Sequence, residues 1–192
     1  AMLCELDAVG GDGDHGMSLT LGARGALVAV APLDGSDVGL FLTTIGKSLI
    51  SGIGAAMGPL YGTALVQAGK YAAGKGTLAP ADIAAMLAAA RDGMIARGKA
   101  KVGDKTMLDA LAPAADAAEA AATGGQTTVE VLRAASLAAD EGAKATSAMI
   151  ATKGRAARLG ERTRGHQDAG ATSTAVVLRA ILDASVREHA PA

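Results

Sequence analysis

The sequence is poor in aromatic residues, with no tryptophan, one phenylalanine and two tyrosines among 192 residues. β-Strands draw on aromatic and β-branched residues, so this scarcity argues against sheets. Alanine is abundant instead; it is the best helix former, and its small side chain lets helices approach closely. We therefore expect an all-α protein whose helices pack tightly.

The chain also has only one cysteine and almost no net charge. A single cysteine, Cys4, excludes an internal disulfide, which suits a reducing compartment. The formal net charge of -1, with 19% charged residues, argues against a surface that binds nucleic acid. No basic-then-apolar segment opens the chain as a secretory signal would. We therefore expect a cytoplasmic protein that does not bind nucleic acid.

Long hydrophobic runs are limited to residues 48–69, the only uncharged stretch long enough to suggest a membrane span. Five glycines and Pro59 interrupt this stretch, and its polar side chains would need partners in lipid. We therefore expect no membrane span, and the length favours one domain over residues 1–192.

Hydrophobic periodicity and helix-terminal residues predict seven helices. Pro80 marks a helix start, and Thr123 followed by two glycines marks a helix end. Four segments between the helices are rich in glycine and polar residues, which is typical of functional loops. The expected helices are 17–31, 37–50, 59–74, 80–97, 106–122, 127–151 and 171–188, and the four segments are 6–16, 51–63, 98–107 and 153–170.

Three carboxylates, Asp7, Asp12 and Asp14, stand within one short stretch with glycines between them. Two unit charges about 4 Å apart repel by about 4 kcal/mol near a protein surface, so converging aspartates need a counter-ion. A hard divalent ion such as Mg²⁺ suits these oxygen ligands. A solvated turn is the alternative, because Asp and Gly are common turn residues, and the spacing alone leaves both open.

Two other interpretations of this stretch fail. A calcium loop of the EF-hand type would need glycine at Met17 and glutamate at Ala23. The segment 11–16 matches the dinucleotide fingerprint as a string, but no apolar strand precedes it and its carboxylates would repel a pyrophosphate. Phosphate bridged by a metal would not be repelled, which favours a nucleotide held through Mg²⁺.

Two further segments could meet an anion. Glycines in 51–63 stand before a helix start, where backbone N–H groups can cradle a phosphate. A flexible linker is the alternative, and Pro59 favours a defined turn. The basic segment 153–170 is either a solvated loop or a lid whose arginines bind phosphate oxygens bidentately.

Taken together, four motifs in this order resemble the nucleotide-binding L subunit of dihydroxyacetone kinase, or the equivalent C-terminal domain of single-chain forms. The resemblance implies an antiparallel eight-helix barrel, with its first helix missing or truncated in this numbering. It also implies ADP or ATP at one rim, with two Mg²⁺. The motifs are Leu6 to Gly16, Gly58-Pro59-Leu60-Tyr61-Gly62-Thr63, Gly103-Asp104-Lys105-Thr106-Met107, and Gly154-Arg155-Ala156 continuing to Gly165-His166-Gln167-Asp168-Ala169-Gly170-Ala171-Thr172-Ser173.

The resemblance also implies roles for individual residues. It makes Asp7, Asp12 and Asp14 the metal ligands. The implied nucleotide contacts are His15, Gly16, Ser18, Ala56 and Met57 at the phosphates, Gly98 and Met107 at the base, and Arg155, Asp168, Ala169 and Gly170 closing over the nucleotide. Three of these depart from the family pattern and bear on nucleotide affinity: Ser18 replaces the usual asparagine, Met57 a serine and Ala169 a proline.

The implied activity is phosphoryl transfer to a hydroxyl of dihydroxyacetone, which a separate K subunit holds covalently. This chain would be the donor half, inactive alone, acting through positioning and charge neutralisation with no catalytic residue beyond the metal and nucleotide ligands. The phosphoryl source is either ATP or a phosphocarrier protein. Two alternatives stay open: a regulatory nucleotide-binding module, and the nucleotide domain of a fatty acid kinase.

Overall fold

The computed structural model describes residues 1–54 and 56–188, and these contain α-helices and 3-10 helices but no strand. The expected all-α class is therefore confirmed. The elements are α1 (Met2–Ala8), α2 (His15–Val30), α3 (Val38–Gly52), α4 (Met57–Tyr71), α5 (Pro80–Gly98), α6 (Leu108–Thr123), α7 (Thr128–Ala145), the 3-10 helices η1 (Thr146–Ala148) and η2 (Arg155–Thr163), and α8 (Ala169–Glu188).

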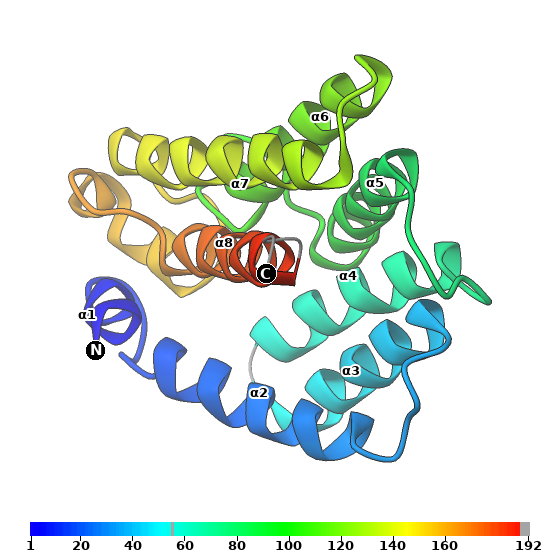
Figure 1. The fold of residues 1–192 in the computed structure, drawn as a ribbon. Helices are drawn as coiled ribbons and strands as arrows, with labels where there is room; N and C mark the ends of the chain where they lie inside the picture. The colour runs from blue at the N-terminus through cyan, green and yellow to red at the C-terminus, as the bar shows by residue number, and fades with distance from the viewer. Residues whose placement is uncertain (55, 189–192) are drawn as a thin grey trace.

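The helices form an antiparallel ring (Figure 1). From α2 onward each helix packs against its successor, and short connections make such neighbours antiparallel. The short helix α1 contacts both α2 and α8 and so closes the ring. Because directions alternate, the N-terminal ends of α2, α4, α6 and α8 all lie at the same rim.

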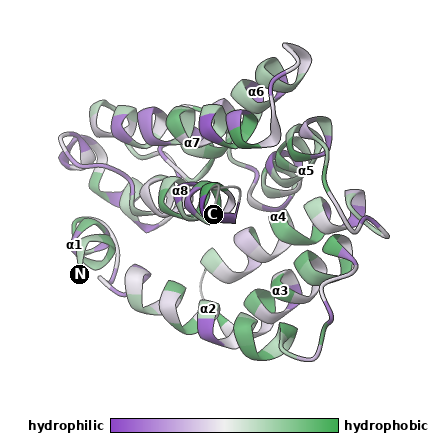
Figure 2. Ribbon diagram, in the orientation of Figure 1, coloured by the Kyte–Doolittle hydropathy of each residue, from purple (hydrophilic) through white to green (hydrophobic). Residues whose placement is uncertain are grey.

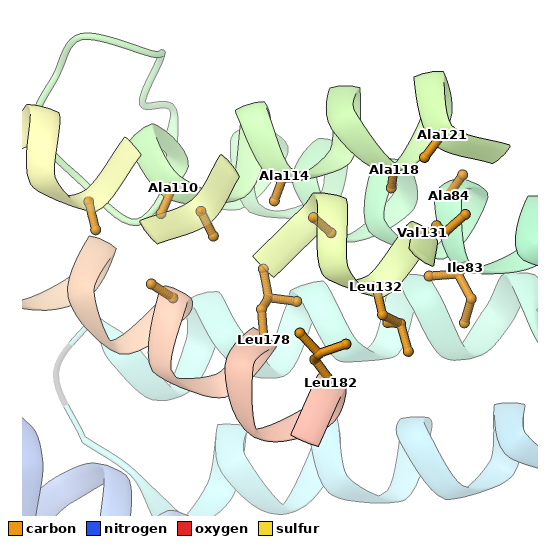
Figure 3. Close-up of a cluster of buried hydrophobic side chains, with 14 of the residues drawn as sticks. Ile83, Ala84, Ala110, Ala114, Ala118, Ala121, Val131, Leu132, Leu178 and Leu182 are labelled. Carbon is orange, nitrogen blue, oxygen red and sulfur yellow. The ribbon is translucent and has the colours of Figure 1, made fainter. Parts of the chain in front are cut away.

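Alanine dominates the core between α5, α6, α7 and α8 (Figure 3). Ala110, Ala114 and Ala118 repeat every four residues along α6, so they share one helix face, and all three are fully buried. Leu178 and Leu182 of α8 fill the space that these small side chains leave. The expectation of close helix packing through alanine is confirmed here.

Glycine serves the same purpose between α3 and α4. Gly46 faces Gly62, and a Cβ atom built on Gly46 would lie 2.6 Å from the Gly62 carbonyl oxygen. Gly39 and Gly69 face each other in the same way near the other end of the pair. We call these four residues the glycine seam; they bring the two helix backbones into direct contact.

Several expected boundaries were wrong. The sequence predicted no helix before residue 17, whereas α1 occupies Met2–Ala8 and α2 begins at His15. The helix expected over 127–151 ends at Ala145, because the buried Thr146 hydroxyl bonds back to the Ala143 carbonyl and the backbone turns extended at Met149. The expected loop 153–170 contains η2, and α8 begins at Ala169. The starts and ends expected at Pro80 and Thr123 are confirmed.

The uncharged stretch 48–69 is divided between two helices, because the backbone is extended at Ile53 and breaks the run between α3 and α4. Among the described helices, only α8 is long and apolar enough to cross a membrane by length and composition, and half of that window is buried in the protein.

Candidate functional site

A cleft of about 720 Å³ opens at the rim where the even-numbered helices begin. The acidic loop, the start of α4, the end of α5 and η2 all contribute to its walls. One residue expected there lies elsewhere: Gly16 packs against α1, and a Cβ built on it would lie 3.1 Å from Cys4 Sγ. The other expected residues line the cleft, namely Asp7, Asp12, Asp14, His15, Ser18, Ala56, Met57, Gly98, Met107, Arg155, Asp168, Ala169 and Gly170.

The three aspartates converge at the mouth of the cleft. One carboxylate oxygen from each of Asp7, Asp12 and Asp14 lies within 4.8 Å of the others. Asp7 is in the last turns of α1, and its Oδ2 accepts a hydrogen bond of 3.1 Å from the Asp14 backbone N–H. A set of hard oxygen donors converging from a helix end and a loop fits a divalent ion such as Mg²⁺.

Arg155, the first residue of η2, lies beside the three aspartates. The Arg155 guanidinium forms an ion pair with the Asp12 carboxylate, and this contact lowers the pKa of Asp12 below its ordinary value. The approach is close because Gly10 has no side chain: a Cβ built there would lie 2.7 Å from Ala156 Cβ. The cleft thus places a guanidinium beside the candidate metal ligands, from a segment far away in sequence.

Two helix N-termini without side-chain caps open into the cleft. No side chain caps the start of α2 at Asp14 or of α4 at Ala56. Met57, the first residue of α4, is buried and lines the cleft. Free N–H groups and the positive ends of the helix dipoles make such termini suitable for phosphate.

A hydroxyl network joins the starts of three helices beneath the cleft. His15 Nε2 of α2 lies 2.8 Å from Ser173 Oγ of α8, which lies 2.7 Å from the Tyr61 hydroxyl of α4. Burial raises the pKa of Tyr61 to about 12, so its hydroxyl stays protonated. Burial also lowers the pKa of His15, which keeps the imidazole neutral near pH 7. Sequence reasoning assigned no role to Tyr61 or Ser173, although both lie within the motifs that carry the family resemblance.

Asp168 precedes α8 and is surrounded by protein except where it borders the cleft. Its Oδ2 accepts a hydrogen bond of 2.8 Å from the Ala171 N–H, in the manner of a helix cap. Burial nevertheless raises its pKa to about 6, and the charge of Asp109 adds to the rise. The ionised carboxylate is therefore costly in this position.

This cost predicts a pH dependence of stability. The folded-state pKa lies above the ordinary value of 3.8, so the folded protein binds the extra proton between about pH 4 and 6 and loses stability as the pH rises through that window. The loss should reach about 3 kcal/mol by pH 7. In Asp168→Asn the amide oxygen can still accept from Ala171, so this loss should vanish. Urea unfolding of both proteins from pH 4 to 7 measures the difference, and parallel curves would contradict the assignment.

Comparison with known proteins places the chain in a family. The family model described as the DAK2 domain matches residues 9–183. The chain therefore belongs to the DAK2 domain family. It is 36% identical over 177 residues to the ADP-binding subunit DhaL of a PEP-dependent dihydroxyacetone kinase from Escherichia coli K12, which covers 92% of this chain and 84% of that protein.

Other relatives are longer. The chain is 37% identical over 183 residues to a D-erythrulose kinase of Mycolicibacterium smegmatis, covering 94% of this chain but 32% of that protein. The dihydroxyacetone kinase of C. freundii has the same fold, with a TM-score of 0.72 and 29% identity over 95% of this chain and 31% of that one. A second structure of that kinase, in complex with AMP-PNP and Mg²⁺, matches with a TM-score of 0.69. The chain thus spans about a third of these proteins.

Proposed function

We propose that this chain is the nucleotide-carrying, phosphoryl-donating subunit of a dihydroxyacetone-type ketose kinase. The observation that carries the proposal is the cleft, where three convergent carboxylates face Arg155 and two helix N-termini without side-chain caps. The relatives named for ADP binding and the neighbour complexed with AMP-PNP and Mg²⁺ support it.

The residues of the cleft suggest how Mg²⁺ and ADP or ATP would be held. Asp7, Asp12 and Asp14 would hold the metal ions. Two ions fit better than one, because three carboxylates and a nucleoside diphosphate carry more negative charge than one divalent ion neutralises. The N-terminal turns of α2 and α4, including Ser18, Ala56 and Met57, would face the phosphates, and His15 would line them from the side. Gly98 and Met107 would border the base.

The chemistry of this half-site would be positioning and electrostatics. Bound Mg²⁺ would neutralise charge that develops on the transferring phosphoryl group. Arg155 would supply a planar guanidinium suited to phosphate oxygens, and Asp168, Ala169 and Gly170 would close the cleft from the start of α8. The acceptor hydroxyl would belong to a ketose on a separate K subunit, which we propose as the partner of this chain in the cytoplasm.

Denaturing the purified chain and identifying the released nucleotide and metal would test the proposal. Retained ADP with about two Mg²⁺ per chain would support a nucleotide rephosphorylated in place by a phosphocarrier protein. An empty chain that binds ATP reversibly with Mg²⁺ would support direct use of ATP. A chain that binds neither nucleotide in the presence of Mg²⁺ would overturn the proposal.

Turnover should require the partner. We expect no phosphorylation of dihydroxyacetone by the chain alone, because it would carry only the donor half of the reaction. Adding a dihydroxyacetone-binding K subunit and the phosphoryl source should give dihydroxyacetone phosphate in a coupled assay. Nucleotide binding without turnover under those conditions would favour a regulatory module instead.

A further inference from the structure

Lys105 is a buried cation whose hydrogen-bond partners are all backbone carbonyls. It lies in the connection between α5 and α6, and 5% of its surface is exposed. Its ammonium donates to three carbonyl oxygens, those of Met149 at 3.2 Å, Thr163 at 2.5 Å and His166 at 2.7 Å. In the described part of the chain no carboxylate lies within ion-pair distance of Lys105. An ammonium has three protons, so its donors are all in use.

The three carbonyls belong to one segment, residues 149–166, which we call the arm. The arm contains η2 and is rich in arginine, and hydrophilic residues are prominent along it in Figure 2. Met149 lies near its beginning, and Thr163 and His166 lie near its end. One ammonium group therefore ties both ends of the arm to the connection before α6.

A second tie comes from the neighbouring residue. The Thr152 hydroxyl donates to Asp104 Oδ1 at 2.6 Å, and the Thr152 N–H donates to the Asp104 carbonyl at 3.2 Å. The connection that bears Asp104 and Lys105 is itself fixed, because Asp109 accepts hydrogen bonds from the N–H groups of Gly103 and Thr106. The arm is thus held against a rigid base.

Arg155 stands at the start of η2, between the anchors at Thr152 and Thr163. Its guanidinium reaches the cleft and pairs with Asp12. A long side chain on a surface segment can adopt many positions, and fixing its backbone reduces that freedom. Lys105 touches the arm and not Arg155 itself, so any effect on the guanidinium passes through the backbone of the arm.

We propose that Lys105 is a positioning residue that holds Arg155 over the metal and nucleotide site by anchoring the arm. This inference rests on the proposed function, because positioning Arg155 matters only if the cleft binds a nucleotide that Arg155 contacts. It makes Lys105 part of the binding machinery although its ammonium has no proton left for the nucleotide.

A double-mutant cycle on nucleotide affinity tests the proposal. Lys105→Met keeps the chain length and removes the donors, and it should weaken binding of Mg²⁺-ADP by about 10-fold or more. In an Arg155→Ala background the same change should weaken binding by less than about 2-fold, because its effect passes through Arg155. Equal fold-changes in both backgrounds, or no change in either, would overturn the proposal. If Lys105 only stabilised the fold, Lys105→Met would weaken binding of Mg²⁺-ADP by the same factor in the parent protein and in the Arg155→Ala background.

Lys99→Met is the matched control. Lys99 is also a lysine with a positive φ just after α5, but its side chain is exposed and none of the described hydrogen bonds ties it to the arm. This control should bind Mg²⁺-ADP as the parent protein does. If Lys105→Met does not fold, as judged by circular dichroism, Thr152→Val takes its place. Loss of the Thr152 hydroxyl should weaken binding of Mg²⁺-ADP in the same direction, and this effect should again be much smaller in the Arg155→Ala background.

Hydrogen exchange in the nucleotide-free protein separates this inference from the proposed function. Lys105→Met should accelerate exchange of amides within residues 149–166 and leave those of α3 unchanged. If the parent protein binds no nucleotide, the proposed function fails, and exchange still shows whether Lys105 anchors the arm. Unchanged exchange in the arm would overturn the anchoring role whatever the nucleotide result.

Discussion

Asp12→Asn should abolish Mg²⁺-dependent nucleotide binding and leave the helical content unchanged. Asp12 is exposed and its carboxylate converges with those of Asp7 and Asp14, so replacing it removes the charge of a proposed metal ligand without opening the core. Loss of residues that only orient a metal ligand costs about 10- to 100-fold in affinity, so loss of a direct ligand should exceed about 100-fold. Calorimetric titration with ADP, with and without Mg²⁺, measures the effect, and circular dichroism checks the fold.

Asp116→Asn provides the control for that experiment. Asp116 is also an exposed aspartate paired with an arginine, Arg91, but this pair lies on the outer surface between α5 and α6. It removes the same charge from the protein, so any general electrostatic effect on nucleotide binding appears in both variants. If Asp12→Asn binds Mg²⁺-ADP as tightly as Asp116→Asn does, the acidic cluster is a solvated turn and the metal assignment is wrong.

Sequence reasoning found the parts of this site whose partners are close along the chain. The aspartates from Asp7 to Asp14 could be found because their mutual repulsion depends only on their spacing, and the structure brings them together. The end of α6 at Thr123 could be found because glycines follow it. Arg155 is different. The family resemblance implied that it closes over the nucleotide, but its approach to Asp12 depends on the closure of the ring and is seen only in the structure.

Other features carried no usable sequence signal. Lys105 binds backbone carbonyls, which every residue possesses, so nothing in the sequence of the arm identifies its partners. The helix α1 was missed because it is only seven residues long and runs directly into a glycine-rich loop. The end of α7 was missed because the Thr146 side chain competes for a backbone carbonyl, which periodicity does not reveal.

Two glycine-to-alanine changes in mid-helix should have opposite effects on the free energy of unfolding, because only one of the two glycines belongs to the glycine seam. Alanine normally stabilises such a position by up to about 1 kcal/mol, because it restricts the unfolded chain and favours helix. Gly25 in α2 is exposed, and a Cβ there would meet only Ser48 Oγ at 3.5 Å, so Gly25→Ala should show this gain. Gly46→Ala should instead lose about 2 kcal/mol, because its Cβ would lie 2.6 Å from a backbone oxygen of α4 that cannot turn aside.

Urea unfolding of Gly25→Ala and Gly46→Ala measures these changes in stability. The single variant Gly62→Ala and the double variant Gly46→Ala with Gly62→Ala then test whether the loss comes from the contact between the two helix backbones. A Cβ on Gly62 would lie 2.5 Å from the Gly46 carbonyl oxygen, so each substitution forces apart the same pair of backbones. Once one alanine has separated α3 from α4, the second finds part of its space already made, and the double variant should lose less stability than the sum of the two single losses. Strict additivity would mean that each clash relaxes locally and that the helices are not held at a common distance by the seam.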